Sequence, residues 1–134
     1  MTTQSKKIKV LISKTSLDGH WRGILVVSTA LRDAGMEVIY GGAMSAAEIA
    51  QAAIQEDVDV VGINIGAGYM AVQGLVQLLH SKGANNVLVV AGGTIPPEDI
   101  PLLKQMGVAG VFPPGSRLDS IVAFIRENAR ASLR

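Results

Sequence analysis

The stretch "IKVLISKTSLDGHWRGILVVSTALRDAGMEVIYGG", residues 8–42, contains a complete strand, loop, helix and second strand. The hydrophobic run at 8–13 predicts the first strand, and an apolar stripe of helical spacing predicts a helix over about 22–34. The short run at 37–42 predicts the next strand. Strands that alternate with helices are typical of α/β proteins with a parallel sheet, so this unit indicates that class.

The same alternation continues to the end of the chain. Further strands are predicted at 58–65, 86–93 and 108–112. The remaining helices are expected at about 70–82 and after three start signals: Ser45 with Glu48, "PPED" at 96–99, and Ser116 ahead of the last helix. Five such units with right-handed crossovers predict a flavodoxin-like (Rossmann-like), doubly wound five-stranded parallel sheet of order 2-1-3-4-5. One domain is expected over 1–134, with its core at about 8–126.

The composition restricts the possible functions. The chain has 134 residues, with 12 Lys and Arg against 11 Asp and Glu, so no strong charge favours nucleic acid or an anionic membrane. Cysteine is absent, which excludes disulfides and fits a cytoplasmic protein. No apolar run indicates membrane spanning or export. A hydrophobic share of 49% with only 4% aromatic residues favours strands covered by helices on both faces.

Ligands of such sheets bind beyond the carboxyl ends of the strands, near the point where the strand order reverses. The loop "KTSLDGHWRG" at 14–23 lies at that edge, and it is longer than a turn requires. Three further loops, "NIGAG", "GGTIPP" and "PPGS", reach the same edge at 64–68, 92–97 and 113–116. Their glycines favour a close approach of the backbone to a ligand.

Three common ligand sites of this fold do not match these loops. A flavin mononucleotide site needs a compact, hydroxyl-rich phosphate loop after the first strand, whereas this loop is long and centred on an imidazole. A phosphoacceptor receiver needs an aspartate at the end of the third strand, where this sequence has Asn64. The three spaced glycines of a dinucleotide fingerprint are missing after the first strand. We therefore expect another ligand.

The loop at 14–23 has a metal chemistry of its own. His20 can bind a metal through one ring nitrogen, and a carboxylate that accepts a hydrogen bond from the other nitrogen fixes the tautomer. Asp18 can supply that carboxylate, and Lys14 can hold it ionised. The other histidine, His80, is expected at a helix end without a function. Because one protein ligand does not build a metal cage, we expect the metal to bring its other ligands in a macrocycle.

This loop carries a resemblance to a known family. "DGHWRG" at 18–23 fits the D-x-H-x-x-G signature of cobalamin-binding domains. The surrounding sequence resembles the small subunit or C-terminal domain of methylmalonyl-CoA mutase-type acyl-CoA mutases. The segments that carry the resemblance are "ALRDAGMEVIY", "AAIQEDVDVVG", "VVAGGTIPPEDIP" and "MGVAGVFPPGS". The resemblance covers about 8–126.

The resemblance implies a cobalamin-binding subunit of an adenosylcobalamin-dependent acyl-CoA mutase, a radical isomerase. The acyl-CoA, of methylmalonyl, 2-hydroxyisobutyryl, isobutyryl or pivalyl type, and the radical chemistry would belong to a separate large subunit with a barrel fold. A heterotetramer is expected, and this chain alone is not expected to turn over.

The resemblance also implies a set of site residues. His20 would be the lower axial ligand of cobalt, with Asp18 and Lys14 as its relay. The displaced dimethylbenzimidazole tail would enter a deep slot lined by the glycine-rich loops. Arg22 is either a solvated charge or a corrin contact. The cofactor-binding residues implied are Asp18, Gly19, His20, Trp21, Arg22, Gly23, Asn64, Gly66, Gly68, Gly92, Gly93, Phe112, Gly115 and Ser116.

The sequence departs from the family at two places. After the third strand the family has S-x-L, and here Asn64 and Gly66 stand at those positions, so the tail would lose an apolar contact. Tyr69 and Met70 are the nearest residues that could fill the space. Trp21 stands where the family mostly has an acidic residue, and we expect it to shield the corrin or contact the partner.

Two rival functions are less favoured. A corrinoid carrier for methyl transfer shares the signature but usually has a helical module before it, and only about seven residues precede the first strand here. A cobalamin sensor would need an output domain. The basic residues Arg126, Arg130 and Arg134 are expected to form a solvated helix face.

Overall fold

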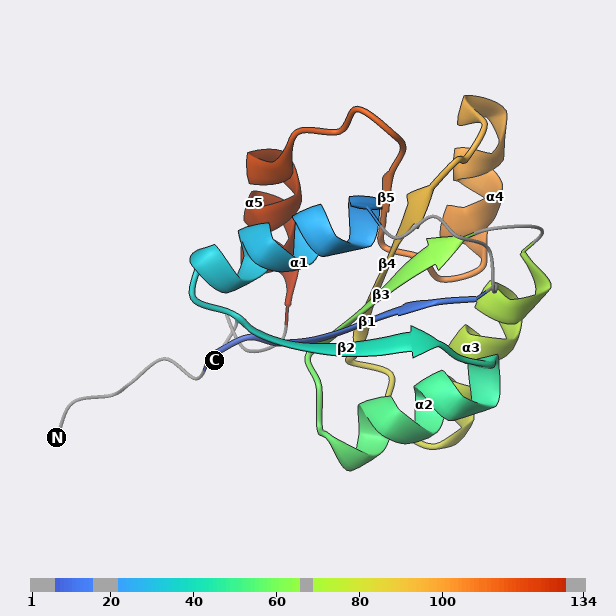
Figure 1. The fold of residues 1–134 in the computed structure, drawn as a ribbon. Helices are drawn as coiled ribbons and strands as arrows, with labels where there is room; N and C mark the ends of the chain where they lie inside the picture. Colours follow the sequence, from blue (N-terminus) through green and yellow to red (C-terminus); the bar gives the residue numbers. More distant parts are fainter. Residues whose placement is uncertain (1–6, 16–21, 66–68, 130–134) are drawn as a thin grey trace, which may run out of the picture.

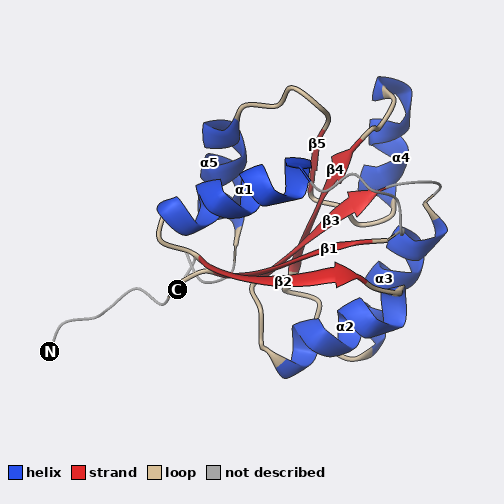
Figure 2. Cartoon of the chain, in the orientation of Figure 1, coloured by secondary structure: helices blue, strands red, loops and turns tan. Residues whose placement is uncertain are grey.

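Five parallel strands form the centre of the structure, a computed structural model that describes residues 7–15, 22–65 and 69–129. They are joined in the order β2-β1-β3-β4-β5, which confirms the predicted topology (Figure 2). Their bounds are β1 (Lys9–Lys14), β2 (Glu37–Ala43), β3 (Val60–Ile65), β4 (Leu88–Gly93) and β5 (Gly110–Phe112).

Helices cover both faces of the sheet. The bounds are α1 (Arg22–Asp33), α2 (Ala46–Gln55), α3 (Met70–Ser81), the 3-10 helix η1 (Pro97–Asp99), α4 (Ile100–Gln105) and α5 (Leu118–Asn128). Helices α1 and α5 lie together on one face, with α2 and α3 on the other (Figure 1). Within the described ranges, no helix is long and apolar enough to cross a membrane.

The two faces carry separate hydrophobic cores, because successive strand residues point to opposite sides. In β1, Leu11 belongs to the core under α2, α3 and α4, whereas its neighbour Ile12 belongs to the core under α1 and α5. The predicted stripe of α3 is fully confirmed, since all four of its members are buried: Val72, Leu75, Val76 and Leu79. The many aliphatic residues of the chain are therefore divided between two cores, one on each face of the sheet.

The predicted helix starts have different outcomes. Ser45 and Glu48 form a reciprocal capping box at α2, with bonds of 2.8 and 3.2 Å, as predicted. The prediction for Ser116 is wrong, because its hydroxyl donates to the Pro113 carbonyl at 2.6 Å and the N-cap position of α5 is Arg117. The loop after β5 uses this serine to hold its own turn.

Three predicted strands begin two residues too early. The apolar Val58 is fully buried before β3, but its N–H donates to the Ala53 carbonyl at the end of α2. The hydrophobic run in the sequence therefore begins before the paired strand, because Val58 is buried without pairing to a neighbouring strand. Arg126 is exposed on α5, as expected for a solvated helix face, and its guanidinium also donates to the Ala34 carbonyl at 2.8 Å. Arg130 and Arg134 lie outside the described residues.

Candidate binding site

Two rows of residues cross the sheet near its carboxyl edge, on the face covered by α1 and α5. Ile12, Gly62 and Val90 are direct neighbours in the register of β1, β3 and β4. Two residues further along each strand, the next row on this face is formed by Lys14, Asn64, Gly92 and Phe112. The strand order reverses between β1 and β3, so these rows lie where ligands of open α/β sheets bind.

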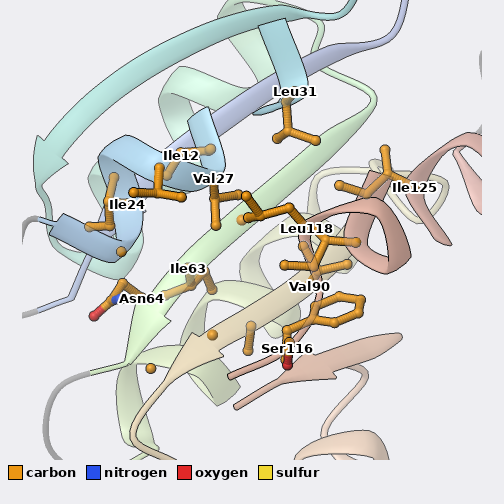
Figure 3. A pocket seen from close by; sticks show the side chains of 18 of the residues that line it. Ile12, Ile24, Val27, Leu31, Ile63, Asn64, Val90, Ser116, Leu118 and Ile125 are labelled. Carbon is orange, nitrogen blue, oxygen red and sulfur yellow. The ribbon is translucent and has the colours of Figure 1, made fainter. Parts of the chain in front are cut away.

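A cavity of about 490 Å³ lies over these rows, except at Lys14, between the sheet and helices α1 and α5 (Figure 3). Its lining comes from segments far apart in the chain. The described residues that line it are Val10, Ile12, Gly23, Ile24, Val26, Val27, Leu31, Gly62, Ile63, Asn64, Val90, Ala91, Gly92, Gly93, Phe112, Pro113, Pro114, Ser116, Leu118, Ile121 and Ile125. A volume of this size accommodates a small-molecule ligand or a part of a larger one.

Gly62 forms part of the cavity floor. A Cβ atom at this position would lie 3.6 Å from Ile12 Cγ1 and 3.7 Å from Val90 Cγ2, which are ordinary contact distances. The strand therefore tolerates a side chain here, and glycine instead leaves open space between its two neighbours. A glycine inside a buried strand often marks the close approach of a ligand.

The two glycines that end β4 have different reasons to be small. Gly93 has φ +112°, and a Cβ there would lie 2.6 Å from the Ile65 carbonyl oxygen. A Cβ at Gly92 would lie 3.4 Å from the Phe112 carbonyl oxygen. The backbone itself therefore requires Gly93, whereas Gly92 keeps the edge of the cavity open.

Phe112 and Ser116 bring the loop after β5 to the cavity. The ring of Phe112 packs edge-on against Phe124 of α5, with centroids 5.6 Å apart and an interplanar angle of 75°. Such a pair holds its rings in one orientation. In the same loop Gly115 adopts φ +89°, a conformation that favours glycine.

Lys14 ends β1 and is fully buried. Its carbonyl accepts a hydrogen bond from the Met44 N–H at 2.9 Å, and the next residue, Thr15, donates its N–H to the Asn64 carbonyl at 3.3 Å. The start of the 14–23 loop is thus fixed between β2 and β3. A buried lysine is rare unless it is paired, which makes this position a candidate for function.

The structure gathers part of the predicted site. Of the predicted residues, those that line the cavity are Gly23, Asn64, Gly92, Gly93, Phe112 and Ser116. Others lie outside the described residues, namely Asp18, Gly19, His20, Trp21, Gly66 and Gly68. Arg22 begins α1, but its side chain is also outside the described part. His80 is exposed in the last turn of α3, on the opposite face of the sheet.

Tyr69 and Met70 do not fill the cavity. Tyr69 packs against the core under α2 and α3, and its hydroxyl donates to Asp99. Met70 is 87% exposed. The expectation that one of them compensates for Gly66 is therefore not supported by their positions.

The helical walls of the cavity were not predicted from the sequence. A slot lined by glycine-rich loops was expected, whereas Val26 and Val27 of α1 and Leu118 and Ile121 of α5 form much of the lining. A signal was present in the run "ILVV" at 24–27, which places apolar residues on more than one helix face. Val26 is 44% exposed.

The lining fits one kind of chemical group. Among the described residues, aliphatic and aromatic side chains form the walls, and the polar side chains Asn64 and Ser116 lie at the margin of the cavity (Figure 3). Such a cavity suits a flat or compact apolar group whose polar remainder stays at the carboxyl edge. The benzimidazole tail of a corrinoid has this character.

Comparison with known proteins identifies the family. A family model described as the B12 binding domain matches residues 8–123. The chain belongs to the B12-binding domain family. It is 42% identical over 125 residues to the 2-hydroxyisobutanoyl-CoA mutase small subunit of Aquincola tertiaricarbonis, covering 88% of this chain and 92% of that protein. It is 38% identical over 120 residues to the pivalyl-CoA mutase small subunit of Xanthobacter autotrophicus, covering 88% and 81%.

Larger relatives contain this B12-binding domain as one part. The methylmalonyl-CoA mutase of Cereibacter sphaeroides is 38% identical over 130 residues, which cover 95% of this chain but only 18% of that protein. Among solved structures, a cobalamin-binding protein from Desulfitobacterium hafniense superposes with a TM-score of 0.76 at 18% identity, covering 91% of this chain and 59% of that one. The NarL receiver domain from Mycobacterium tuberculosis gives 0.73 at 19% identity, covering 96% and 99%. These structural likenesses show the fold alone.

Proposed function

We propose that the chain is the cobalamin-binding subunit of an adenosylcobalamin-dependent acyl-CoA mutase. One observation carries the proposal: the 42% identity extends over 92% of a protein that is itself the small subunit of 2-hydroxyisobutanoyl-CoA mutase. The similarity to a second small subunit, that of pivalyl-CoA mutase, gives the same assignment. The acyl-CoA that is rearranged belongs to the same chemical class, a branched acyl thioester.

The cavity between α1, α5 and the sheet holds the detached lower base of the cofactor. The apolar walls remove the base from water, which favours binding in proportion to the apolar area covered. Asn64 and Ser116, which line the cavity at its margin, would hydrogen-bond the polar linker of the tail. When bound, adenosylcobalamin supplies a carbon radical through homolysis of its cobalt–carbon bond.

His20 is the proposed lower axial ligand of cobalt. Asp18 would accept a hydrogen bond from the other ring nitrogen and so keep the imidazole in one tautomer and orientation. Lys14 would hold the charge of Asp18. The burial of Lys14 at the end of β1 supports this role, because a lysine in that environment is stabilised by a carboxylate partner.

The proposed partner is a large subunit that binds the acyl-CoA. This chain then supplies the cofactor platform, and neither subunit turns over alone. We propose a heterotetramer of two small and two large subunits, in the cytoplasm. The exposed carboxyl edge, including Met70 at the start of α3, is available to such a partner.

Titration and reconstitution test the proposal. The purified chain should convert cobalamin to its base-off spectrum on binding. Addition of the large subunit should yield a complex whose mass is measured by light scattering, and turnover of 2-hydroxyisobutyryl-, pivalyl-, isobutyryl- or methylmalonyl-CoA should require both chains. Absence of cobalamin binding by the chain, alone and in the complex, would overturn the proposed function.

A further inference from the structure

A shallow groove of about 360 Å³ runs along the outer side of α1, next to the start of α5. The described residues that line it are Leu25, Val26, Thr29, Ala30, Asp33 and Leu118. Three of them, Leu25, Val26 and Leu118, are large apolar residues that the fold leaves exposed. Exposed apolar side chains that lie together often mark a protein–protein interface, whereas single ones are normal on any surface.

The groove is apolar along most of its length. The hydroxyl of Thr29 donates to the Leu25 carbonyl at 2.9 Å, so this polar group is satisfied within the helix. Of the described residues that line the groove, only Asp33 is charged, and it is the last residue of α1. A polar ligand therefore finds few partners here, and an apolar protein surface fits better.

The charge of Asp33 is placed unfavourably for its own helix. A helix carries a partial positive charge at its N-terminus and a partial negative charge at its C-terminus. Asp33 lies at the negative end, next to the favourable charge of Arg32, and within the described ranges no ion pair or hydrogen bond engages its carboxylate. The first turn of α1, at the positive end, has no acidic residue. Each end therefore lacks the charge that the other end of a second, antiparallel helix would supply.

We infer that the groove is a contact between two copies of this chain, whose α1 helices pack antiparallel. When Asp33 of one copy lies beside the first turn of α1 in the other copy, the helical spacing sets Leu25 opposite Ala30. The same register sets Val26 opposite Thr29, so each larger side chain meets a smaller one. The surface is thus complementary to itself in shape and in charge, as a two-fold symmetric dimer requires.

The predicted dimer is weak. One helix pair makes a small interface, so association is expected only above roughly micromolar concentrations of the chain. The contact needs neither cobalamin nor a large subunit, and the inference is therefore independent of the proposed function. It also gives the two small subunits of the proposed heterotetramer a direct contact.

Sedimentation equilibrium of the chain alone, at increasing concentration, tests the inference. The unmodified chain should pass from monomer to dimer, and Leu25→Ser should lower the association constant about tenfold or more, because the dimer contains this contact twice. Ile54→Ser is the matched control, since Ile54 is 40% exposed on α2, at the other face of the sheet, and Leu25 is 56% exposed. A chain that stays monomeric up to millimolar concentration, or equal effects of the two variants, would overturn the inference.

The charge of Asp33 is tested separately. Asp33→Asn should weaken association by about 3- to 30-fold, since two contacts with a helix N-terminus are lost. The urea midpoint of the dilute monomer should stay unchanged or rise, because the acid is unfavourable in the isolated helix. Glu127→Gln removes an acid from the last turn of α5, outside the groove, and should not change association. Association that is insensitive to Asp33→Asn would contradict the antiparallel arrangement.

Cross-linking distinguishes the arrangement of the two helices. The chain has no cysteine, so Leu25→Cys and Ala30→Cys each introduce a single thiol. In an equimolar mixture, the disulfide between the two different variants should form faster than the disulfide between two identical ones. Faster joining of identical variants would contradict the register. If the chain alone stays monomeric but Leu25→Ser prevents assembly with the large subunit, the groove belongs to that partner and the inference is wrong.

Discussion

Tyr69 and Asp99 join two loops at the carboxyl edge of the sheet through a hydrogen bond of 2.5 Å from the tyrosine hydroxyl to the carboxylate. Tyr69 lies directly before α3, and Asp99 ends η1 after β4. Gly93, between these elements, packs its backbone against Ile65. The bond therefore fastens the start of α3 to the segment that follows β4.

The titration of Tyr69 should report this bond. Its hydrogen bond to Asp99, followed by burial and by the charges of Asp99 and Glu98, raises the pKa of Tyr69 above the ordinary value of 10.0. The chain has two tyrosines, so in Tyr40→Phe the phenolate absorbance reports Tyr69 alone. Adding Asp99→Asn should lower the midpoint of that titration. An unchanged midpoint would show that the two groups are not bonded in solution.

The same shift predicts how stability depends on pH. A pKa that is higher in the folded state means that folding favours the protonated phenol of Tyr69. The stabilisation that this phenol gives to the fold is complete below the unfolded pKa of about 10 and is lost as the pH rises through the folded pKa. Urea midpoints of the unmodified chain should therefore fall more steeply above pH 10 than those of Tyr69→Phe. Parallel curves for the two proteins would contradict the linkage.

Gly93→Ala should destabilise the fold strongly. At φ +112° an alanine is strained, and its Cβ would lie 2.6 Å from the Ile65 carbonyl oxygen. Gly83→Ala is the matched control, because Gly83 has φ +79° with nothing within 4 Å of the added atom. Urea denaturation should show a loss of about 1 kcal/mol for the control and roughly 3 kcal/mol for Gly93→Ala. Equal losses would mean that the backbone angle alone requires glycine.

Gly62→Ala should separate folding from cofactor binding. The added methyl meets Ile12 and Val90 at ordinary distances, so the free energy of unfolding should be unchanged or rise by up to about 1 kcal/mol. The methyl occupies the cavity floor, and cobalamin should bind about fivefold or more weakly because of overpacking. Gly74→Ala adds a methyl 3.7 Å from Ala46 Cβ, away from the cavity, and should not affect binding. Equal cobalamin affinity in the two variants would place the tail short of Gly62.

The sequence predicted the fold well because its signals were periodic. The stripe of α3 and the capping box of Ser45 depend on local patterns, and both are confirmed. The strand order, also confirmed, follows from the general rules for connecting parallel strands. The cap predicted for Ser116 failed because the hydroxyl had a competing partner, the Pro113 carbonyl, that the sequence does not reveal.

Residues at the rim of the cavity were predicted from the sequence, but the residues that line its interior were not. Asn64, Gly92 and Ser116 were found because they stand at strand ends with polar or small side chains. The walls formed by Val26 and Ile121 could not be distinguished from ordinary core, since apolar helix stripes look the same in sequence whether they cover a sheet or line a cavity. The distinction depends on how far two helices stand apart, which is a tertiary property.

Asp18→Asn tests the proposed relay to His20. An asparagine keeps the shape of the side chain but orients the imidazole less well, so cofactor affinity or reconstituted activity should fall by roughly 10- to 100-fold. His80→Gln is the control, since His80 is exposed at the end of α3 and should have no effect. Activity of Asp18→Asn equal to that of the unmodified enzyme would remove Asp18 from the proposed mechanism.

The axial ligand of cobalt tests the central claim most directly. Electron paramagnetic resonance of the Co(II) form, bound to protein labelled with nitrogen-15 histidine, distinguishes a histidine nitrogen from the nitrogen of dimethylbenzimidazole. We predict that the axial nitrogen splitting changes to that of nitrogen-15 and is lost in His20→Ala. A splitting that keeps the pattern of the dimethylbenzimidazole nitrogen would contradict it, because the base would then still be on cobalt and not in the cavity between α1 and α5.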